Sequence, residues 1–165
     1  MKIQLKAITH FAELSQETHC YAASLYVDGK KVGRVSNSGH GGADDFDGDW
    51  KVYEEIDAWV AANMEGTQWD DGVLPANLEG LCCELINDHL AEKELKKLLK
   101  GRVVYVQDNT LMEMRWKGIR KIDSSCVTRA WATLTGEERK TGKEFKILNK
   151  LPFAEALVLF KSLTS

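Results

Sequence analysis

Apolar and polar residues alternate along the first part of the chain in the manner of half-buried strands. The alternation covers residues 2–11 and residues 21–27. The pair Asp28-Gly29 then leads into a third strand-like run, residues 30–35. Asp-Gly between two such runs is the preferred chemistry of a tight hairpin turn, because both central positions need positive φ. The pattern predicts three strands, with a bulge or a close backbone approach at Gly33.

Two helices are predicted in the middle of the chain. Residues 37–49 form a polar, glycine-rich loop that ends in Asp49, an N-cap for a helix from Trp50 to Met64. Apolar residues recur along this helix at a spacing that gives one buried stripe. A second loop, residues 67–75, precedes a longer helix from Asn77 to Lys100.

The last part of the chain shows strand-like runs again. The predicted strands are Arg102–Gln107, Leu111–Trp116, Cys126–Thr133 and Phe145–Leu148. Pro152 then opens a short final helix. Grouped strands with hairpin turns favour an α+β fold: an antiparallel or mixed sheet built from hairpins, with two central helices and a short C-terminal helix packed on it.

Length and composition predict a single domain over residues 1–165. The chain is 44% apolar and 28% charged, which is ordinary globular usage. No apolar stretch approaches the roughly 20 residues that span a bilayer, so we expect neither a membrane helix nor a signal peptide. The cysteines lack CxxC spacing, and we expect them to be reduced thiols in the cytoplasm. They are Cys20, Cys82, Cys83 and Cys126.

Charge is distributed unevenly along the chain. Residues 1–92 carry 6 Lys/Arg against 17 Asp/Glu, whereas residues 93–165 carry 16 against 8. A region of one sign makes a field that selects its partners. The alternative interpretation is that the acidic half and the basic half neutralise each other, within one subunit or across a homo-oligomer, which we expect the protein to form.

The acidic residues of the glycine-rich loop are candidate metal ligands. Carboxylates are ligands for hard cations such as Mg²⁺ or Ca²⁺, although the EF-hand template fails here because Trp50 and Ile56 replace the required Gly and Glu. A looser divalent-cation site remains as one interpretation. The same residues can instead cap the following helix and stabilise its dipole. They are Asp44, Asp45, Asp47 and Asp49.

The loop also offers candidates for binding a small ligand, Asn37 and His40. Its glycines would let backbone N–H groups cradle a phosphate, but the neighbouring carboxylates would repel that phosphate unless a cation bridged them. No P-loop, GxSxG or HExxH motif occurs. The sequence therefore favours a binding protein over an enzyme.

A basic segment near residue 118 is a second candidate binding region. Its Lys and Arg side chains can neutralise phosphates, and an exposed aromatic ring can stack on a base, so a nucleotide or nucleic acid is a candidate ligand. Alternatively, Trp116 shares a strand face with Met112 and Met114 and belongs to the core. The candidate residues are Arg115, Trp116, Lys117, Arg120 and Lys121.

Residues 13–42 resemble the start of a family of small uncharacterised proteins of phages and prophages. The shared features are a Ser-x-Glu-Thr segment at Ser15–Thr18, a Leu-Tyr-Val-x-Gly-Lys-Lys-Val-Gly hairpin at Leu25–Gly33, and an Asn-x-Gly-x-Gly-Gly loop at Asn37–Gly42. The resemblance implies no established activity. It implies a setting, the host cytoplasm, in which small accessory proteins block host defence proteins or sequester nucleotide signals.

These observations lead to one principal hypothesis and two alternatives. We expect a non-enzymatic accessory protein of phage type that blocks a host factor or sequesters a small phosphate-bearing ligand. One alternative is a metal-dependent enzyme acting on phosphoesters through His40 and the loop aspartates. The other is a nucleic-acid-binding protein that uses the basic half.

Overall fold

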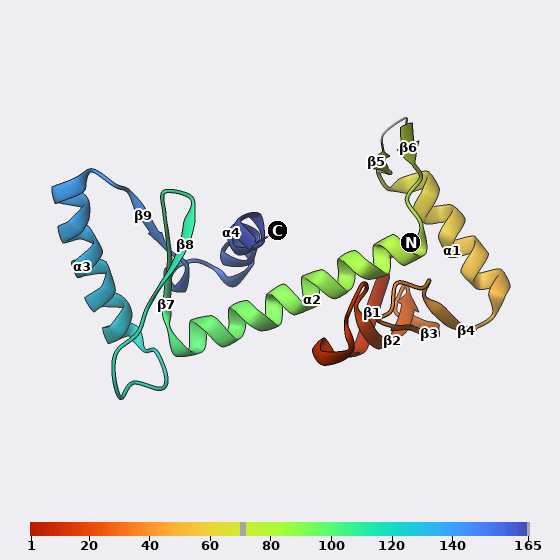
Figure 1. The fold of residues 1–165 in the computed structure, drawn as a ribbon, viewed down its shortest axis with the longest axis horizontal. Coiled ribbons are helices and arrows are strands. Elements are labelled where there is room, and N and C mark those ends of the chain that lie inside the picture. The colour runs from red at the N-terminus through yellow and green to blue at the C-terminus, as the bar shows by residue number, and fades with distance from the viewer. Residues whose placement is uncertain (70–71, 165) are drawn as a thin grey trace. The chain divides into compact units, whose positions relative to one another are not determined.

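The computed structural model describes residues 1–69 and 72–164, which form two compact units, Met1–Asp88 and His89–Ser165 (Figure 1). Their boundary lies within four residues of the predicted boundary between the acidic and basic halves. The first unit carries 6 Lys/Arg against 16 Asp/Glu, and the second 16 against 9. The boundary between the acidic and basic halves therefore nearly coincides with the boundary between the two units. The single domain expected from chain length stays a prediction.

The N-terminal unit contains a four-stranded antiparallel sheet with the order β1-β2-β3-β4. Its strands are β1 (Ile3–His10), β2 (Cys20–Val27), β3 (Lys30–Ser38) and β4 (Asp45–Gly48), with a short 3-10 helix, η1 (Ala12–Leu14), after β1. The predicted hairpin at Asp28-Gly29 is confirmed, because both residues have positive φ (49° and 83°). The register shift falls beside Gly33, and a Cβ there would clash with the Phe46 ring, so both parts of that prediction hold.

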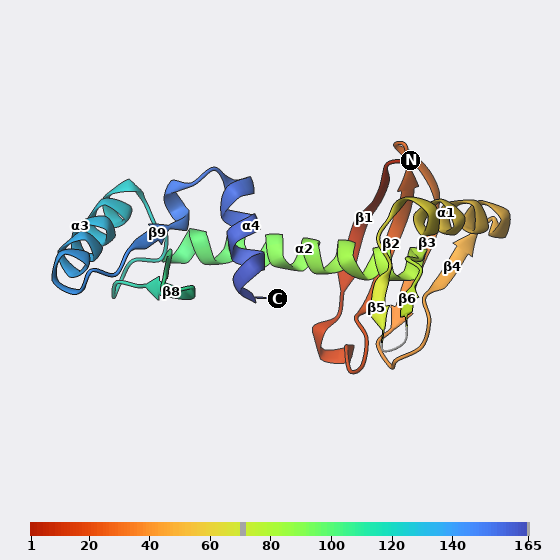
Figure 2. The same cartoon turned by 90° about the horizontal axis from the view of Figure 1, so that it is seen from above.

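Helices on one side of this sheet complete the unit (Figures 1 and 2). Asp49 caps α1 (Trp50–Asn63) as predicted, accepting from the Lys51 backbone N–H at 3.0 Å. A two-stranded hairpin, β5 (Thr67–Trp69) and β6 (Gly72–Leu74), leads to α2 (Leu78–Gly101), which contributes its first turns to this unit. The buried core residues of the unit include Ala23, Leu25, Val35, Ile56, Val60, Leu78, Cys82 and Ile86.

The C-terminal unit places helices on both faces of a three-stranded antiparallel sheet with the order β8-β7-β9. Its strands are β7 (Val103–Gln107), β8 (Thr110–Met114) and β9 (Phe145–Ile147), and its remaining helices are α3 (Ser124–Thr141), η2 (Leu148–Lys150) and α4 (Phe153–Thr164). Val103 and Tyr105 pack against α3, whereas Val104 packs on the opposite side with Leu95 and Phe160. This alternation is the one expected of successive strand residues.

The structure confirms the α+β class and corrects one element. The predicted strand Cys126–Thr133 is wrong, because these residues lie in α3. Asp123 caps this helix by accepting from the Cys126 N–H at 3.0 Å, and Cys126, Ala130 and Leu134 line one buried face at helical spacing. The two predicted loops also contain short strands, β4 in the first and the β5–β6 hairpin in the second. Among the described residues, no helix combines the length and the apolarity needed to cross a bilayer.

Candidate functional site

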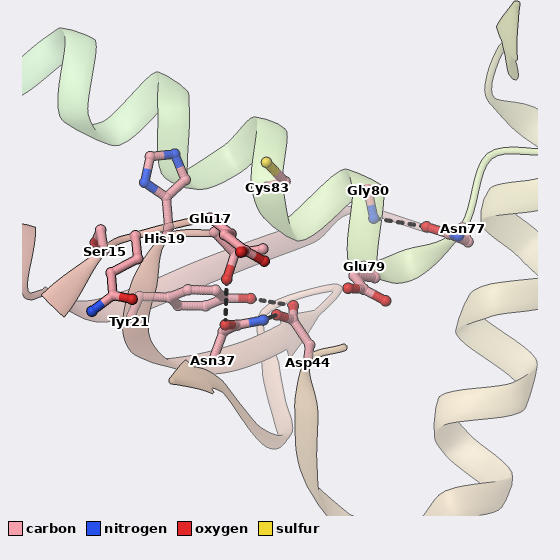
Figure 3. Close-up of a pocket in the computed structure, with 12 residues that line it drawn as sticks. Ser15, Glu17, His19, Tyr21, Asn37, Asp44, Asn77, Glu79, Gly80 and Cys83 are labelled. Carbon is pink, nitrogen blue, oxygen red and sulfur yellow. Dashed lines mark hydrogen bonds between the residues drawn. The ribbon is translucent and has the colours of Figure 1, made fainter. Parts of the chain in front are cut away.

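A cavity of about 640 Å³ lies in the N-terminal unit (Figure 3). One wall is the segment Ser15–His19, which follows η1, and a second is formed by Tyr21 of β2, Asn37 of β3 and Asp44 just before β4. The first two turns of α2, from Asn77 to Cys83, close the remaining side. This volume falls within the ordinary range for small-molecule pockets, about 300–1,000 Å³.

Asn37 is the structural centre of this pocket. It is the one polar residue that is buried among those described, at 6% exposure. Its Oδ1 accepts from the Thr18 hydroxyl and from the Gly39 N–H, both at 2.8 Å. Its Nδ2 donates to the Gly42 carbonyl oxygen at 2.8 Å and to Asp44 Oδ1 at 3.0 Å. The amide thereby makes all four bonds of which it is capable, and it holds the loop in a single conformation.

The segment Ser15–Thr18 and the loop Asn37–Gly42 interlock, although they are separated in sequence. The Gly39 carbonyl oxygen accepts from the N–H groups of Gln16 at 2.9 Å and Glu17 at 3.1 Å. Gly39 has a φ of 88°, and a Cβ there would overlap the Leu14 carbonyl oxygen. Ser15–Thr18 and Asn37, which belong to two of the motifs noted in the sequence, therefore lie together in the lining of the pocket.

Tyr21 and Asp44 form a hydrogen-bonded pair across the pocket floor (Figure 3). The Tyr21 hydroxyl donates to Asp44 Oδ2, and burial followed by this bond raises the pKa of Tyr21 far above its usual range. Cys82 lies against the same hydroxyl, and burial with the nearby Asp44 charge raises the pKa of Cys82 to about 12. Both groups therefore stay protonated at neutral pH, which disfavours the thiolate form of Cys82.

Three carboxylates line the pocket with no Lys or Arg among the lining residues: Glu17, Asp44 and Glu79. Burial raises the pKa of Glu79, and the charge of Asp44 raises it further. The backbone of Asp44 lowers the pKa of Glu79 and offsets part of this effect. Uncompensated negative charge at this site favours the binding of a cation.

A chain of hydrogen-bonded side chains runs from Ser15 through His10 to His19 beside the pocket. The Ser15 hydroxyl donates to the Phe11 carbonyl oxygen at 2.9 Å, so its proton is not directed to a base. His10 Nε2 lies 3.2 Å from Ser15 Oγ and 3.3 Å from His19 Nδ1. His19 Nε2 contacts Asn87 Oδ1 at 2.7 Å, which fixes the His19 ring. These contacts link Ser15 to His10 and His10 to His19, and they order this side of the pocket.

The loop residues predicted as ligands separate in the structure. Asn37 and Asp44 line the pocket, whereas His40 is exposed and is not a lining residue. Asp45 and Asp47 lie on the exposed positions of β4, and Asp49 caps α1. In the part of the chain that the structure describes, no three His, Cys, Asp or Glu side chains are grouped to hold a metal ion. The geometry gives the metal-dependent interpretation no support.

The basic segment lies in the C-terminal unit, and its residues do not share one cavity. Trp116 packs on the Val103 core cluster, with the Arg129 guanidinium 5.9 Å from its ring centroid. Arg115 and Trp116 line a separate cavity in that unit, while the exposed residues Lys117, Arg120 and Lys121 are outside its lining. The core interpretation holds only in part: Trp116 and Met114 are partly buried against the Val103 cluster, whereas Met112 is exposed and Trp116 lies beyond the end of β8.

The sequence did not predict several of the pocket residues, chiefly Thr18, Tyr21 and Glu79. In the sequence, Tyr21 has the pattern of an ordinary strand residue and Glu79 that of an exposed helix residue. Only the packing of α2 near β2 brings the two side chains into one pocket. Thr18 carried a signal, since it belongs to the motif segment that accompanies the glycine-rich loop. The cysteines are free thiols as predicted, with Cys20, Cys82 and Cys126 buried and Cys83 exposed.

Comparison with known proteins gives no relative on which function can rest. No family model, no curated protein and no solved structure matches the chain.

Proposed function

We propose that the protein is a non-enzymatic accessory protein of phage type that blocks a host factor, and that its N-terminal pocket receives a positively charged side chain of that factor. The observation that carries this proposal is the set of three carboxylates without a lining Lys or Arg. An arginine or lysine side chain would supply the missing charge. The resemblance of residues 13–42 to phage proteins supports the biological setting.

The size of the pocket favours an organic cation over a metal ion. A volume of about 640 Å³ far exceeds that of a single ion, and the described residues include no metal-ligating group of three. A guanidinium group offers five N–H donors in a planar fork, which suits several carboxylates at once. The methylene stem of the same side chain can lie against the Tyr21 ring.

A phosphate-bearing ligand suits this pocket less well. The charges of Glu17, Asp44 and Glu79 would repel a phosphate, and no cation of the pocket lining offsets them. Sequestration of a nucleotide therefore has support only from the net charge of the C-terminal unit. The acidic N-terminal unit, in contrast, would steer a basic protein toward the pocket and raise the association rate at low salt.

A titration with a matched pair of small molecules tests the proposal. The probes are Nα-acetyl-L-arginine amide and its neutral isostere Nα-acetyl-L-citrulline amide, followed through the NMR signal of the Asn37 side-chain amide. We expect the arginine probe to bind with a dissociation constant on the order of millimolar and the citrulline probe at least about tenfold more weakly. Equal affinities, or no shift with either probe, would exclude a pocket that selects a cation.

A further inference from the structure

An exposed tryptophan at the start of α1 is held rigidly in place. The Trp50 side chain is 59% exposed, yet its ring stacks on Tyr53 with 4.6 Å between centroids and 9° between planes. Its Nε1 donates to Glu54 Oε1 at 3.1 Å. Phe46 of β4 contacts Tyr53 in turn, with 5.3 Å between ring centroids. A large apolar ring is thus fixed in water with one face covered and the other open.

The surroundings of this ring are acidic. Asp49 directly precedes Trp50 in the chain, Asp47 lies three residues before it, and Glu54 accepts from its indole N–H. Lys51 is the nearest cation in sequence, and it is exposed. The charges of Asp57, Glu79 and Asp44 help to raise the pKa of Tyr53, after burial. Two of those three are pocket carboxylates, so Tyr53 lies in the electric field of the pocket.

We propose that Trp50 and Tyr53 form a second recognition site, a platform on which a guanidinium or ammonium group of a basic protein segment lies against the open face of Trp50. The face of an indole ring attracts cations, and the nearby carboxylates add to that attraction. They also disfavour a nucleobase, because its phosphates would be repelled. The platform uses none of the residues that line the pocket, so it extends the proposed function through a separate set of contacts.

Trp131 in α3 offers a natural comparison. It is exposed to a similar degree, 46%, but the Lys150 ammonium already lies 5.2 Å from its ring centroid. It also belongs to the unit with excess Lys and Arg. A second cation would be repelled, because the Lys150 ammonium already lies over this ring and the unit carries a net positive charge. Trp131 is therefore the matched control for Trp50.

Titration of the ¹⁵N-labelled full chain with a tetra-arginine amide tests this inference. We expect the indole Nε1–H signal of Trp50 to shift and that of Trp131 to stay in place. Trp50→Ala is expected to weaken binding about 3- to 10-fold, the range of a partly exposed cation–π contact, while Trp131→Ala leaves it unchanged. Both side chains are exposed, so neither variant is expected to unfold the protein.

The same titration separates this site from the pocket. A shift of the Asn37 amide signal without one of Trp50, or an equal loss of affinity in Trp131→Ala, would overturn the platform and leave the pocket proposal standing. A shift of the Trp50 signal without a shift of the Asn37 signal would overturn the pocket proposal and leave the platform standing. A Trp50 signal that moves on simple dilution, with no peptide present, would show that a second copy of the chain occupies the platform and would also overturn the inference.

Discussion

Asn37 Nδ2 donates to Asp44 Oδ1 at 3.0 Å, and the Tyr21 hydroxyl donates to the other oxygen of the same carboxylate. The Asp44 side chain is therefore fixed at both oxygens before any ligand arrives. A carboxylate held in this way loses little conformational freedom on binding, which is the usual benefit of a preorganised site.

Asn37→Ala should destabilise the protein by about 2–4 kcal/mol, because it leaves the Thr18 hydroxyl and the Gly39 N–H without their buried acceptor. Urea unfolding would measure this change. Asn63→Ala is the control, since the exposed Asn63 amide donates only to the Trp59 carbonyl oxygen of its own helix. A loss of the same size in both variants would show that Asn37 does not hold the loop.

The glycines of the loop should differ sharply in their tolerance of alanine. Gly39→Ala is expected to cost at least about 2 kcal/mol, from a left-handed φ and from overlap with the Leu14 carbonyl oxygen. Gly42→Ala should change stability by less than about 0.5 kcal/mol, because nothing lies within 4 Å of its Cβ position. The thermal unfolding midpoints of Gly39→Ala and Gly42→Ala test this prediction. Equal midpoints would contradict the described backbone conformation at Gly39.

The parts of the fold that sequence predicted correctly are those with a local cause. Asp28-Gly29 specifies its turn by backbone conformation alone, and Asp49 specifies a helix start through one cap bond. Residues 126–133 include the β-branched residues Val127, Thr128 and Thr133, a residue class that favours strands. The segment is nevertheless helical, because Cys126 and Ala130 lie at helical spacing on one buried face.

The candidate site was predictable only in its loop. Asn37 and Asp44 were identified from composition, and both line the pocket. Glu79 was out of reach, because 35 residues separate it from Asp44 and only the docking of α2 makes them neighbours. The aspartates were grouped as ligands because they are close in sequence, yet β4 turns Asp45 and Asp47 away from Asp44 as strand residues must.

Glu79→Gln should raise stability at neutral pH. Because the pKa of Glu79 is raised in the folded state, folded protein holds this proton more tightly than unfolded protein does. The associated stability is present at acidic pH and is lost as pH rises through the folded pKa. The variant should therefore exceed the wild type in melting temperature at pH 7, with the difference shrinking at pH 4.

Glu65→Gln, an exposed carboxylate outside the pocket lining, serves as the control for this pH series. A melting difference for Glu79→Gln that does not change between the two pH values, or one of opposite sign at pH 7, would contradict the described electrostatics of the pocket.

Trp116→Ala should destabilise the protein by about 1–3 kcal/mol, since the ring packs on the Val103 cluster. Lys117→Glu with Arg120→Glu should leave stability within about 0.5 kcal/mol, because both side chains are exposed. Chemical unfolding measures both effects. Binding of single-stranded DNA by the wild type that weakens with salt and disappears in the double variant would instead favour the nucleic-acid alternative.

The most direct test of the central claim is the affinity of Nα-acetyl-L-arginine amide for Glu17→Gln with Glu79→Gln, measured beside the wild type and Glu65→Gln. Removing two of the three pocket carboxylates should weaken binding at least about tenfold, and the control should bind as the wild type does. Unchanged affinity in the double variant would show that the pocket carboxylates do not recognise a cation.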